Sequence, residues 1–145
     1  MADSKAKVVW KGKMSFDGSS ANGFSLPIGT STESGGDNDG FRPMELLLIG
    51  MAGCTAMDVI SILEKKRQDV TGFEVRVVEA ERAAEHPKVY THIVLEYVVT
   101  GKNVDRAAVE RAVELSSTKY CSAEAMLGKV AKIENKITVL EAEHV

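Results

Sequence analysis

Hydrophobic and polar residues alternate near the N-terminus in the pattern of a half-buried strand. Over residues 7–16 the apolar side chains share one side, at Val8, Trp10, Met14 and Phe16. Asp17-Gly18 then predicts a turn, and residues 23–28 predict a second short strand. Residues 29–40 are rich in Gly, Ser, Thr and Asp and lack apolar anchors, so we expect a loop there.

One long helix is predicted from Pro43 to about Gln68. Proline suits the first helical position, and no Gly or Pro after Gly53 interrupts the segment before Thr71-Gly72. The first half is apolar almost all round, and the last turns are charged. The first half also contains a run of small side chains, namely Gly50, Ala52, Gly53, Cys54, Thr55 and Ala56. Two glycines in a helix interior indicate a close packing partner, either a partner helix or the protein's own sheet.

The second half of the chain predicts a hairpin, two helices and a last strand. Residues 73–83 and 89–100 alternate as strands on either side of a turn at 85–88, and the phase slips at Val78 as at a β-bulge. Helices are predicted from Asp105 to about Ser117 and from Ser122 to about Ala131, and a strand over 137–140. Without repeats or an internal linker, this order predicts an α+β fold in a single domain over residues 1–145.

Composition and charge narrow the class of protein. With 145 residues, 44% of them hydrophobic and 27% charged, the chain can bury a core of its own. The net charge of -3 and the interspersed signs argue against nucleic-acid binding. Residues 1–5 lack a secretion signal, and the apolar run from Leu46 to Met57 is shorter than the roughly 20 residues of a membrane helix. We therefore expect a cytoplasmic protein without a membrane partner.

The chain contains two cysteines, Cys54 and Cys121. A reducing compartment argues against a permanent structural disulfide between them. A metal site is not expected, because no cysteine or histidine pair has ligand spacing and the histidines are scattered, at His86, His92 and His144.

Each cysteine admits both an inert and a reactive interpretation. Cys54 lies deep in the long helix, where a free cysteine is more often a small hydrophobic residue than a nucleophile. Cys121 stands where a helix begins, so backbone N–H groups and the helix dipole favour its thiolate, although inert burial is equally compatible. Glu124 could complete a capping box with position 121, although its carboxylate would oppose thiolate formation.

Two further carboxylates flank Cys54 along the helix. Asp58 lies four residues later, on the same face, where hydrogen bonding or ion pairing is the favoured role. Glu45 lies nine residues earlier, which places it on the opposite face of a straight helix. Glu45 could therefore reach its own Cys54 only through a bend, whereas a neighbouring subunit could bring it to the other cysteine.

Together, the cysteines suggest a redox cycle. One thiolate would attack a peroxide and become a sulfenic acid, and the second would condense with it to a disulfide that an external dithiol reduces. The spacing of the two cysteines in the sequence neither supports nor excludes their contact.

Two motifs in this chain resemble those of the OsmC/Ohr family. FRPMELLL at 41–48, followed by GMAGC at 50–54, is similar to the first cysteine motif of the family, and KYCS at 119–122 with Met126-Leu127 is similar to the second. DVISIL at 58–63, KRQ at 66–68 and EHPKV at 85–89 look most like the YhfA-type branch. The order of predicted elements also resembles that of the family over nearly the whole chain.

The resemblance implies both a fold and a site. The implied fold is OsmC-like, with an antiparallel sheet packed on a long central helix, in an intertwined homodimer with active sites at the subunit interface. Cys54 would be the peroxidatic and Cys121 the resolving residue, with Glu45 as a further catalytic residue and Arg42 as the substrate-binding residue. The small side chains around Gly50 and Gly53 would then pack against the partner's helix.

Two positions depart from the Ohr pattern. The Ohr carboxylate directly follows the proline, where this chain has Met44 and carries Glu45 one place later. The Ohr N-terminal arginine has no counterpart, because Arg42 is the first arginine here; Lys11, Lys13 or Arg42 are the candidates to replace it.

The leading hypothesis for function is a thiol-dependent peroxidase. It would reduce organic hydroperoxides or hydrogen peroxide through Cys54 and Cys121, without a metal or an organic cofactor. The alternative is a non-catalytic dimeric protein of the same fold that binds a small molecule or senses redox state. A low thiol pKa and turnover would favour the first, and two unreactive thiols the second.

Overall fold

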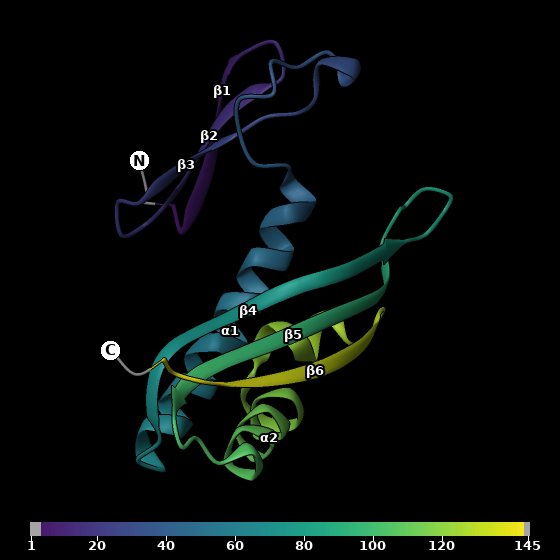
Figure 1. Ribbon diagram of the computed structural model, residues 1–145. Coiled ribbons are helices and arrows are strands. Elements are labelled where there is room, and N and C mark those ends of the chain that lie inside the picture. Colours follow the sequence, from purple (N-terminus) through teal and green to yellow (C-terminus); the bar gives the residue numbers. More distant parts are fainter. Residues whose placement is uncertain (1–3, 144–145) are drawn as a thin grey trace. The chain divides into compact units, whose positions relative to one another are not determined.

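The computed structural model describes residues 4–143, which form two compact units, one that ends at Leu48 and one that begins at Ile49 (Figure 1). Helices and sheets are both present, which confirms the predicted α+β class. Residues 1–3, part of the segment in which we expected no secretion signal, and His144 lie outside the described residues. A single domain over residues 1–145 stays a prediction.

The N-terminal unit is built on a three-stranded antiparallel sheet. Its strands β1 (Ala6–Gly12), β2 (Ser15–Ser20) and β3 (Ser25–Ile28) are neighbours in chain order. The turn between β1 and β2 follows Gly12 and Lys13, whose φ angles of 110° and 47° favour glycine and tight turns. The predicted turn at Asp17-Gly18 is therefore wrong, because these residues pair with Val9 and Val8 inside the sheet.

A loop leads from β3 to the long helix, as predicted. It contains one short 3-10 turn, η1 (Thr32–Ser34), and returns to the sheet where Phe41 bridges Ile28. Gly40 makes this return possible, because a Cβ atom there would lie 2.7 Å from the backbone of Ile28. The loop therefore lies close against the end of β3.

Helix α1 (Pro43–Lys65) confirms the predicted long helix and ends three residues earlier than expected. Arg67, with a φ of 57°, ends the helical path. The buried residues Met51, Thr55, Val59 and Leu63 recur every four positions and define one face. By length and composition the whole helix would suit a membrane crossing, unlike the shorter run from Leu46 to Met57, but core helices of soluble proteins share this character.

The second sheet contains β4 (Asp69–Arg82), β5 (Tyr90–Lys102) and β6 (Lys132–Glu141), in that order. The β4–β5 pair is the predicted antiparallel hairpin, and its register shifts between Val77 and Glu79, which confirms the bulge at Val78. Strand β6 is longer than predicted and runs parallel to β5. This sheet is therefore mixed, because the chain crosses back through helices before β6.

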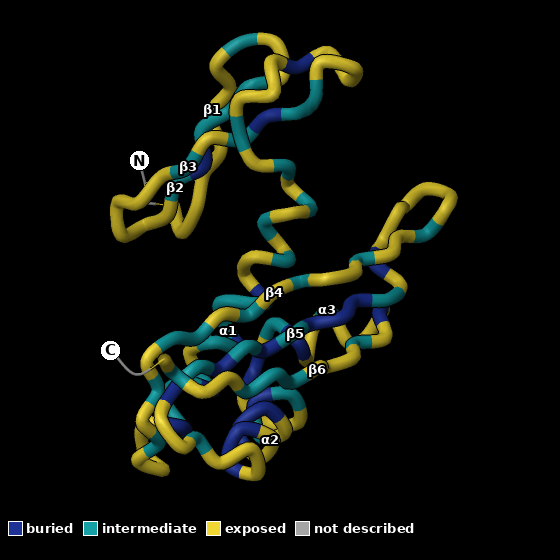
Figure 2. The backbone as a smooth tube through the Cα atoms, viewed as in Figure 1, coloured by how far each residue is buried: buried dark blue, intermediate teal, exposed yellow. Residues whose placement is uncertain are grey.

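Strand β5 carries the core of this unit. Ile93, Leu95, Tyr97 and Val99 point to one face and are fully buried. Figure 2 shows buried backbone along β5 and α2, and exposed backbone at the tip of the β4–β5 hairpin. The alternation read from the sequence of this strand is confirmed.

The crossover consists of α2 (Arg106–Leu115), a π-helical turn η2 (Ser116–Tyr120) and α3 (Ser122–Leu127). Asp105 caps α2 by accepting a hydrogen bond from the Ala107 N–H at 3.0 Å. The wide turn η2 closes with a bond from the Cys121 N–H to the Ser116 carbonyl at 2.8 Å. Such turns occur often at functional sites, and this one places Cys121 at the start of α3, which is shorter than predicted.

Candidate functional site

The structure brings Cys54 and Cys121 together inside the C-terminal unit. Cys54 comes from α1 and is half-buried, whereas Cys121 precedes α3 and is only 3% exposed. Cys54 helps to raise the pKa of Cys121, both as a hydrogen-bonding partner and through its charge, so the two thiols are close neighbours, and both are free. This proximity could not be shown from the sequence.

Burial controls the protonation of Cys121. It raises the pKa of this thiol from 9.0 to about 12, and a hydrogen bond from the Glu124 N–H to Sγ at 3.4 Å opposes that rise. The hydrogen bond and charge of Cys54 and the charge of Glu124 raise the pKa further. The thiol of Cys121 is therefore protonated at neutral pH.

The start of α3 stabilises the Cys121 thiolate, as expected, but too weakly to bring its pKa below the ordinary value. One N–H group of α3 does reach the sulfur, as the capping pattern predicted. The helix, however, is short, and desolvation of the thiolate outweighs the bond. The Glu124 carboxylate does not complete the capping box, because the Cys121 N–H donates to Ser116 instead.

A chain of buried hydroxyl groups lies in the same unit. Thr55 Oγ1 is 2.8 Å from the Tyr97 hydroxyl and 2.7 Å from Ser116 Oγ, and Ser116 donates to Asp58 at 2.9 Å. Burial raises the pKa of Tyr97, with smaller contributions in the same direction from the charges of Glu124 and Cys121. The tyrosine hydroxyl therefore stays neutral and shares the electrostatic environment of the thiols.

Asp58 takes the hydrogen-bonding role that its position suggested. Its carboxylate accepts from Ser116 and also lines a shallow surface pocket of about 340 Å³ between α1 and the region of η2. Tyr120 lines the same pocket, and the Lys119 ammonium lies 5.1 Å from its ring centroid. The hydroxyl chain thus begins at a solvent-facing pocket and ends in the core.

Sequence reasoning missed the contributions of Thr55, Ser116 and Tyr97. Each was assigned to a strand or helix without a chemical role, because a hydroxyl group has no periodic signal of its own. The predicted helix ends near Leu115 and Ser116. The π-helical turn that follows, which the sequence did not predict, directs the Ser116 side chain into the core.

Arg42 and Glu45 belong to the N-terminal unit, where their described hydrogen bonds are local. The Arg42 N–H donates to Glu45 Oε2 at 3.1 Å, so Glu45 caps the start of α1. The Arg42 guanidinium donates to the Gly40 carbonyl at 2.9 Å and to Asn38 Oδ1. The guanidinium therefore holds the loop that precedes the helix.

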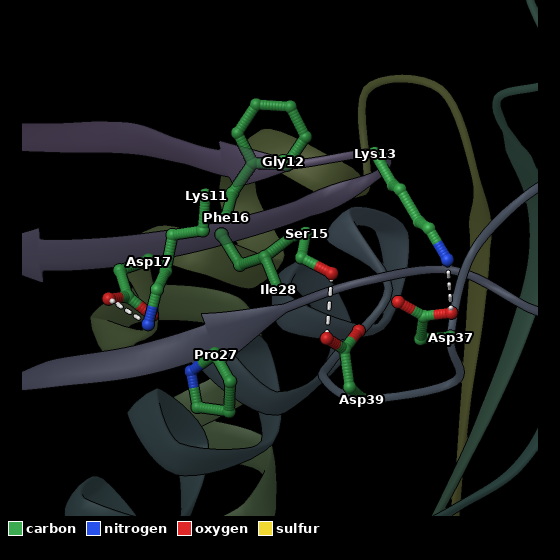
Figure 3. Close-up of a pocket in the computed structure, with 10 residues that line it drawn as sticks. All are labelled: Lys11, Gly12, Lys13, Ser15, Phe16, Asp17, Pro27, Ile28, Asp37 and Asp39. Atoms are coloured by element: carbon green, nitrogen blue, oxygen red, sulfur yellow. Dashed lines mark hydrogen bonds and ion pairs between the residues drawn. The ribbon is translucent and has the colours of Figure 1, made fainter.

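The other two candidates to replace the Ohr arginine form exposed ion pairs. Figure 3 shows Lys13 directed at Asp37 and Lys11 beside Asp17, at N–O distances of 3.4 and 3.3 Å. They line a cavity of about 460 Å³ in the N-terminal unit, across which Ser15 donates to Asp39 at 2.6 Å. Exposed pairs of this kind are weak and leave both ammonium groups accessible.

One group of side chains on the C-terminal sheet has the composition of a metal site. Glu79, Glu81 and His92 each place one potential ligand atom within 4.8 Å of the others. His92 Nε2 lies 2.8 Å from Glu134, and that bond, helped by Lys132, lowers the pKa of Glu134. No ligand spacing is visible in the sequence here, because Glu79 and Glu81 lie on β4 and His92 lies on β5.

Comparison with known proteins identifies the family. Residues 36–136 match the family of OsmC-like proteins. Protein YhfA of Escherichia coli strain K12 is 41% identical over 138 residues, which cover 95% of this chain and 99% of YhfA.

Two solved structures share the fold. A hypothetical protein from Aquifex aeolicus VF5 is 31% identical with a TM-score of 0.83, covering 99% of this chain and 100% of that one. An organic hydroperoxide resistance protein OsmC from Legionella pneumophila has a TM-score of 0.70 at 17% identity, covering 92% and 95% of the two chains. The second likeness concerns the fold alone.

The family match includes both of the neighbouring cysteines. The identity to YhfA extends over nearly the full length of both proteins. The chain therefore belongs to the OsmC-like protein family and is similar to YhfA over nearly its full length.

Proposed function

We propose that the protein is a thiol-dependent peroxidase that reduces organic hydroperoxides or hydrogen peroxide through a two-cysteine cycle. The observation that carries the proposal is the proximity of the half-exposed Cys54 thiol to the buried, protonated Cys121 thiol, whose pKa Cys54 helps to raise. An organic hydroperoxide resistance protein from Legionella pneumophila has the same fold, which supports the substrate class.

The two environments assign different roles to the two thiols. Cys54 is accessible to a small peroxide, so it is the peroxidatic residue. Cys121 is 3% exposed and is protonated until its sulfur is needed, so it is the resolving residue. Because Cys121 is buried and protonated, it does not compete with Cys54 for the peroxide.

The cycle balances without a metal or an organic cofactor. The Cys54 thiolate attacks the distal peroxide oxygen, the O–O bond breaks, and the alkoxide leaves and takes up a proton as the alcohol. Cys121 then attacks the sulfur of the Cys54 sulfenic acid, the S–O bond breaks, and the hydroxide leaves as water with the thiol's proton. An external dithiol reduces the resulting disulfide and restores both thiols.

Arg42 and Glu45 belong to the proposal through the family motif. Arg42 would bind the peroxide and Glu45 would orient the reacting groups, supplied to a thiol pair in the assembled dimer. Glu45 lies three residues after Arg42 and caps α1, so both side chains lie at the start of this helix. We infer that Arg42 and Glu45 replace the arginine and glutamate of the Ohr pattern.

A homodimer accounts for the exposed apolar residues of α1. Leu47, Ile49 and Met57 are 48%, 52% and 74% exposed, and a Cβ atom added at Gly50 or Gly53 meets nothing within 4 Å. A second copy of α1 fits these open positions and covers apolar surface without a membrane. We propose a cytoplasmic homodimer, in which the two units of each chain are joined as one domain.

Counting free thiols tests the proposal. The reduced protein is treated with a slight excess of cumene hydroperoxide, denatured, and titrated for thiols, with Cys54→Ser and Cys121→Ser as matched variants. We expect the wild type to lose both thiols to an intramolecular disulfide. The Cys121→Ser variant should instead hold a sulfenic acid at Cys54 that dimedone traps, and the Cys54→Ser variant should keep its thiol.

Persistence of both wild-type thiols would refute the peroxidase. The fold would then serve the alternative, a dimeric protein that binds a small molecule or senses redox state. Loss of both thiols with rapid turnover by a dithiol would establish the cycle.

A further inference from the structure

Glu124 is a buried carboxylic acid with an unused oxygen. Its side chain is only 4% exposed, and Oε1 accepts a hydrogen bond from Ser117 Oγ at 2.8 Å. Oε2 has no hydrogen-bond partner within the part of the chain that the structure describes. A buried oxygen without a hydrogen-bond partner typically lowers the stability of the folded protein by about 1–3 kcal/mol. A carboxyl group kept at such a position therefore calls for a functional explanation.

The carboxyl group is held beside the thiol of Cys121. The Glu124 N–H donates to Sγ at 3.4 Å, and the carboxylate charge acts on both Cys121 and Tyr97. On the other side, Asn135 donates to Ser117 Oγ at 2.8 Å, which fixes the serine that holds Oε1. Backbone and side-chain bonds thus fix the residue at both ends.

The resolving step needs a group of this kind. The Cys121 thiol must lose its proton as its sulfur attacks Cys54, and burial opposes a free thiolate. The other titratable groups around the pair are Asp58 on α1 and Tyr97 on β5, and both are engaged in the hydroxyl chain through Ser116 and Thr55. Of these groups, Glu124 is the one with a buried oxygen that lacks a hydrogen-bond partner among the described residues.

We propose that Glu124 is the proton acceptor for Cys121 during disulfide formation, an inference that rests on the proposed peroxidase cycle. As the Cys121 sulfur bonds to the Cys54 sulfur, its proton passes, directly or through one water molecule, to Glu124 Oε2, which makes no hydrogen bond to Sγ before the step. The S–O bond of the sulfenic acid breaks, and Glu124 returns the proton to the leaving hydroxide, which departs as water. The carboxylate is regenerated, so no further oxidant or reductant is consumed.

Single-turnover kinetics separate this role from a structural one. Reduced wild type, Glu124→Gln and Glu124→Asp are mixed with one equivalent of cumene hydroperoxide. Sulfenic acid is measured by dimedone trapping and the disulfide by denatured thiol count, between pH 6 and pH 9. Glu110→Gln is the matched control, because it makes the same exchange at an exposed carboxylate of α2 that pairs with Arg106 and leaves Glu124 in place.

We expect Glu124→Gln to oxidise at Cys54 at the wild-type rate and to form the disulfide about 10²-fold more slowly at pH 7, as for loss of a general base. Because hydroxide then takes the thiol proton, the rate for this variant should rise with pH and close the gap to wild type. Glu124→Asp keeps a carboxylate and should lie between them, and Glu110→Gln should follow the wild-type profile.

Two failures are distinguishable. If the wild type forms no disulfide, the peroxidase cycle is wrong and this inference falls with it. If the wild type forms the disulfide and both Glu124 variants match its rate and pH profile, the inference alone is wrong. An equal deficit in Gln and Asp variants at every pH would assign Glu124 a purely structural role and would also overturn it.

Discussion

The Thr55 hydroxyl of α1 is hydrogen-bonded to the Tyr97 hydroxyl of β5 at 2.8 Å, and both side chains are fully buried. This bond joins the helix that carries Cys54 to the central strand of the sheet. Thr55 directly follows Cys54 and bonds Ser116 as well, so the same threonine ties the helix of Cys54 to the turn that precedes Cys121. The hydroxyl chain therefore sets the relative position of the two thiols.

Replacing Thr55 by valine keeps the shape of the side chain and removes its hydroxyl. Tyr97 and Ser116 would each lose a buried partner, so we expect the free energy of unfolding to fall by about 1–3 kcal/mol. Urea unfolding of the reduced protein measures this loss. Thr71→Val is the control, because Thr71 is exposed on β4, and it should change stability by less than about 0.5 kcal/mol.

The spacing of apolar residues predicts much of this fold, and each incorrect prediction has a physical cause. The long helix, the bulge at Val78 and the buried face of β5 follow from patterns of apolar side chains. The turn after Gly12 was misplaced, since Asp17-Gly18 is the stronger local turn signal but sheet pairing overrides it. The parallel pairing of β6 depends on the path of the crossover, which no local pattern encodes.

The candidate site was predictable only in part for a similar reason. Both cysteines were identified from their motifs. Their proximity, the inward turn at Ser116 and the burial of Glu124 depend on how distant segments pack. Burial also reversed the effect expected from the helix start at Cys121, because desolvation of a thiolate exceeds what one backbone N–H restores.

The stability of the reduced protein should decrease at alkaline pH. The pKa of Cys121 is raised in the folded state, from 9.0 to about 12, so the folded protein holds this proton more tightly than the unfolded chain. The stabilisation is complete below pH 9 and is lost as pH rises toward 12, with a slope that approaches about 1.4 kcal/mol per pH unit.

Urea unfolding between pH 8 and pH 10 under reducing conditions measures this dependence. The window stays below the range where Tyr97, whose pKa is also raised, contributes strongly. Cys121→Ala removes the titrating thiol and should show a shallower slope. A variant slope equal to that of the wild type would mean that Cys121 is not the group responsible.

Native alkylation should distinguish the two cysteines. Cys54 is half-buried, whereas Cys121 is 3% exposed, so iodoacetamide should modify Cys54 first. A pKa raised from 9.0 to about 12 lowers the thiolate fraction of Cys121 by about 10³-fold at neutral pH. Peptide mapping by mass spectrometry reports each site. In urea the two cysteines should react at similar rates, which controls for intrinsic reactivity.

Leucine at Gly53 should separate folding from dimer formation. A Cβ atom at this position meets nothing within 4 Å in the chain, and leucine favours the helix by up to about 1 kcal/mol over glycine. The monomer fold should therefore tolerate Gly53→Leu, whereas a partner helix packed against Gly53 would not. Sedimentation velocity should show the variant shifted toward monomer, with its circular dichroism unchanged.

Gly101→Ala is the contrasting control, because a Cβ atom there would lie 2.2 Å from the Asp69 carbonyl oxygen inside the β4–β5 pair. It should lower stability through the chain's own fold and leave any dimer of the folded protein intact. A Gly53→Leu protein that remains fully dimeric would place the partner's contact elsewhere on the chain. The open space at Gly53 would then need another occupant, and the apolar residues Ile49 and Met57 would mark where to look for it.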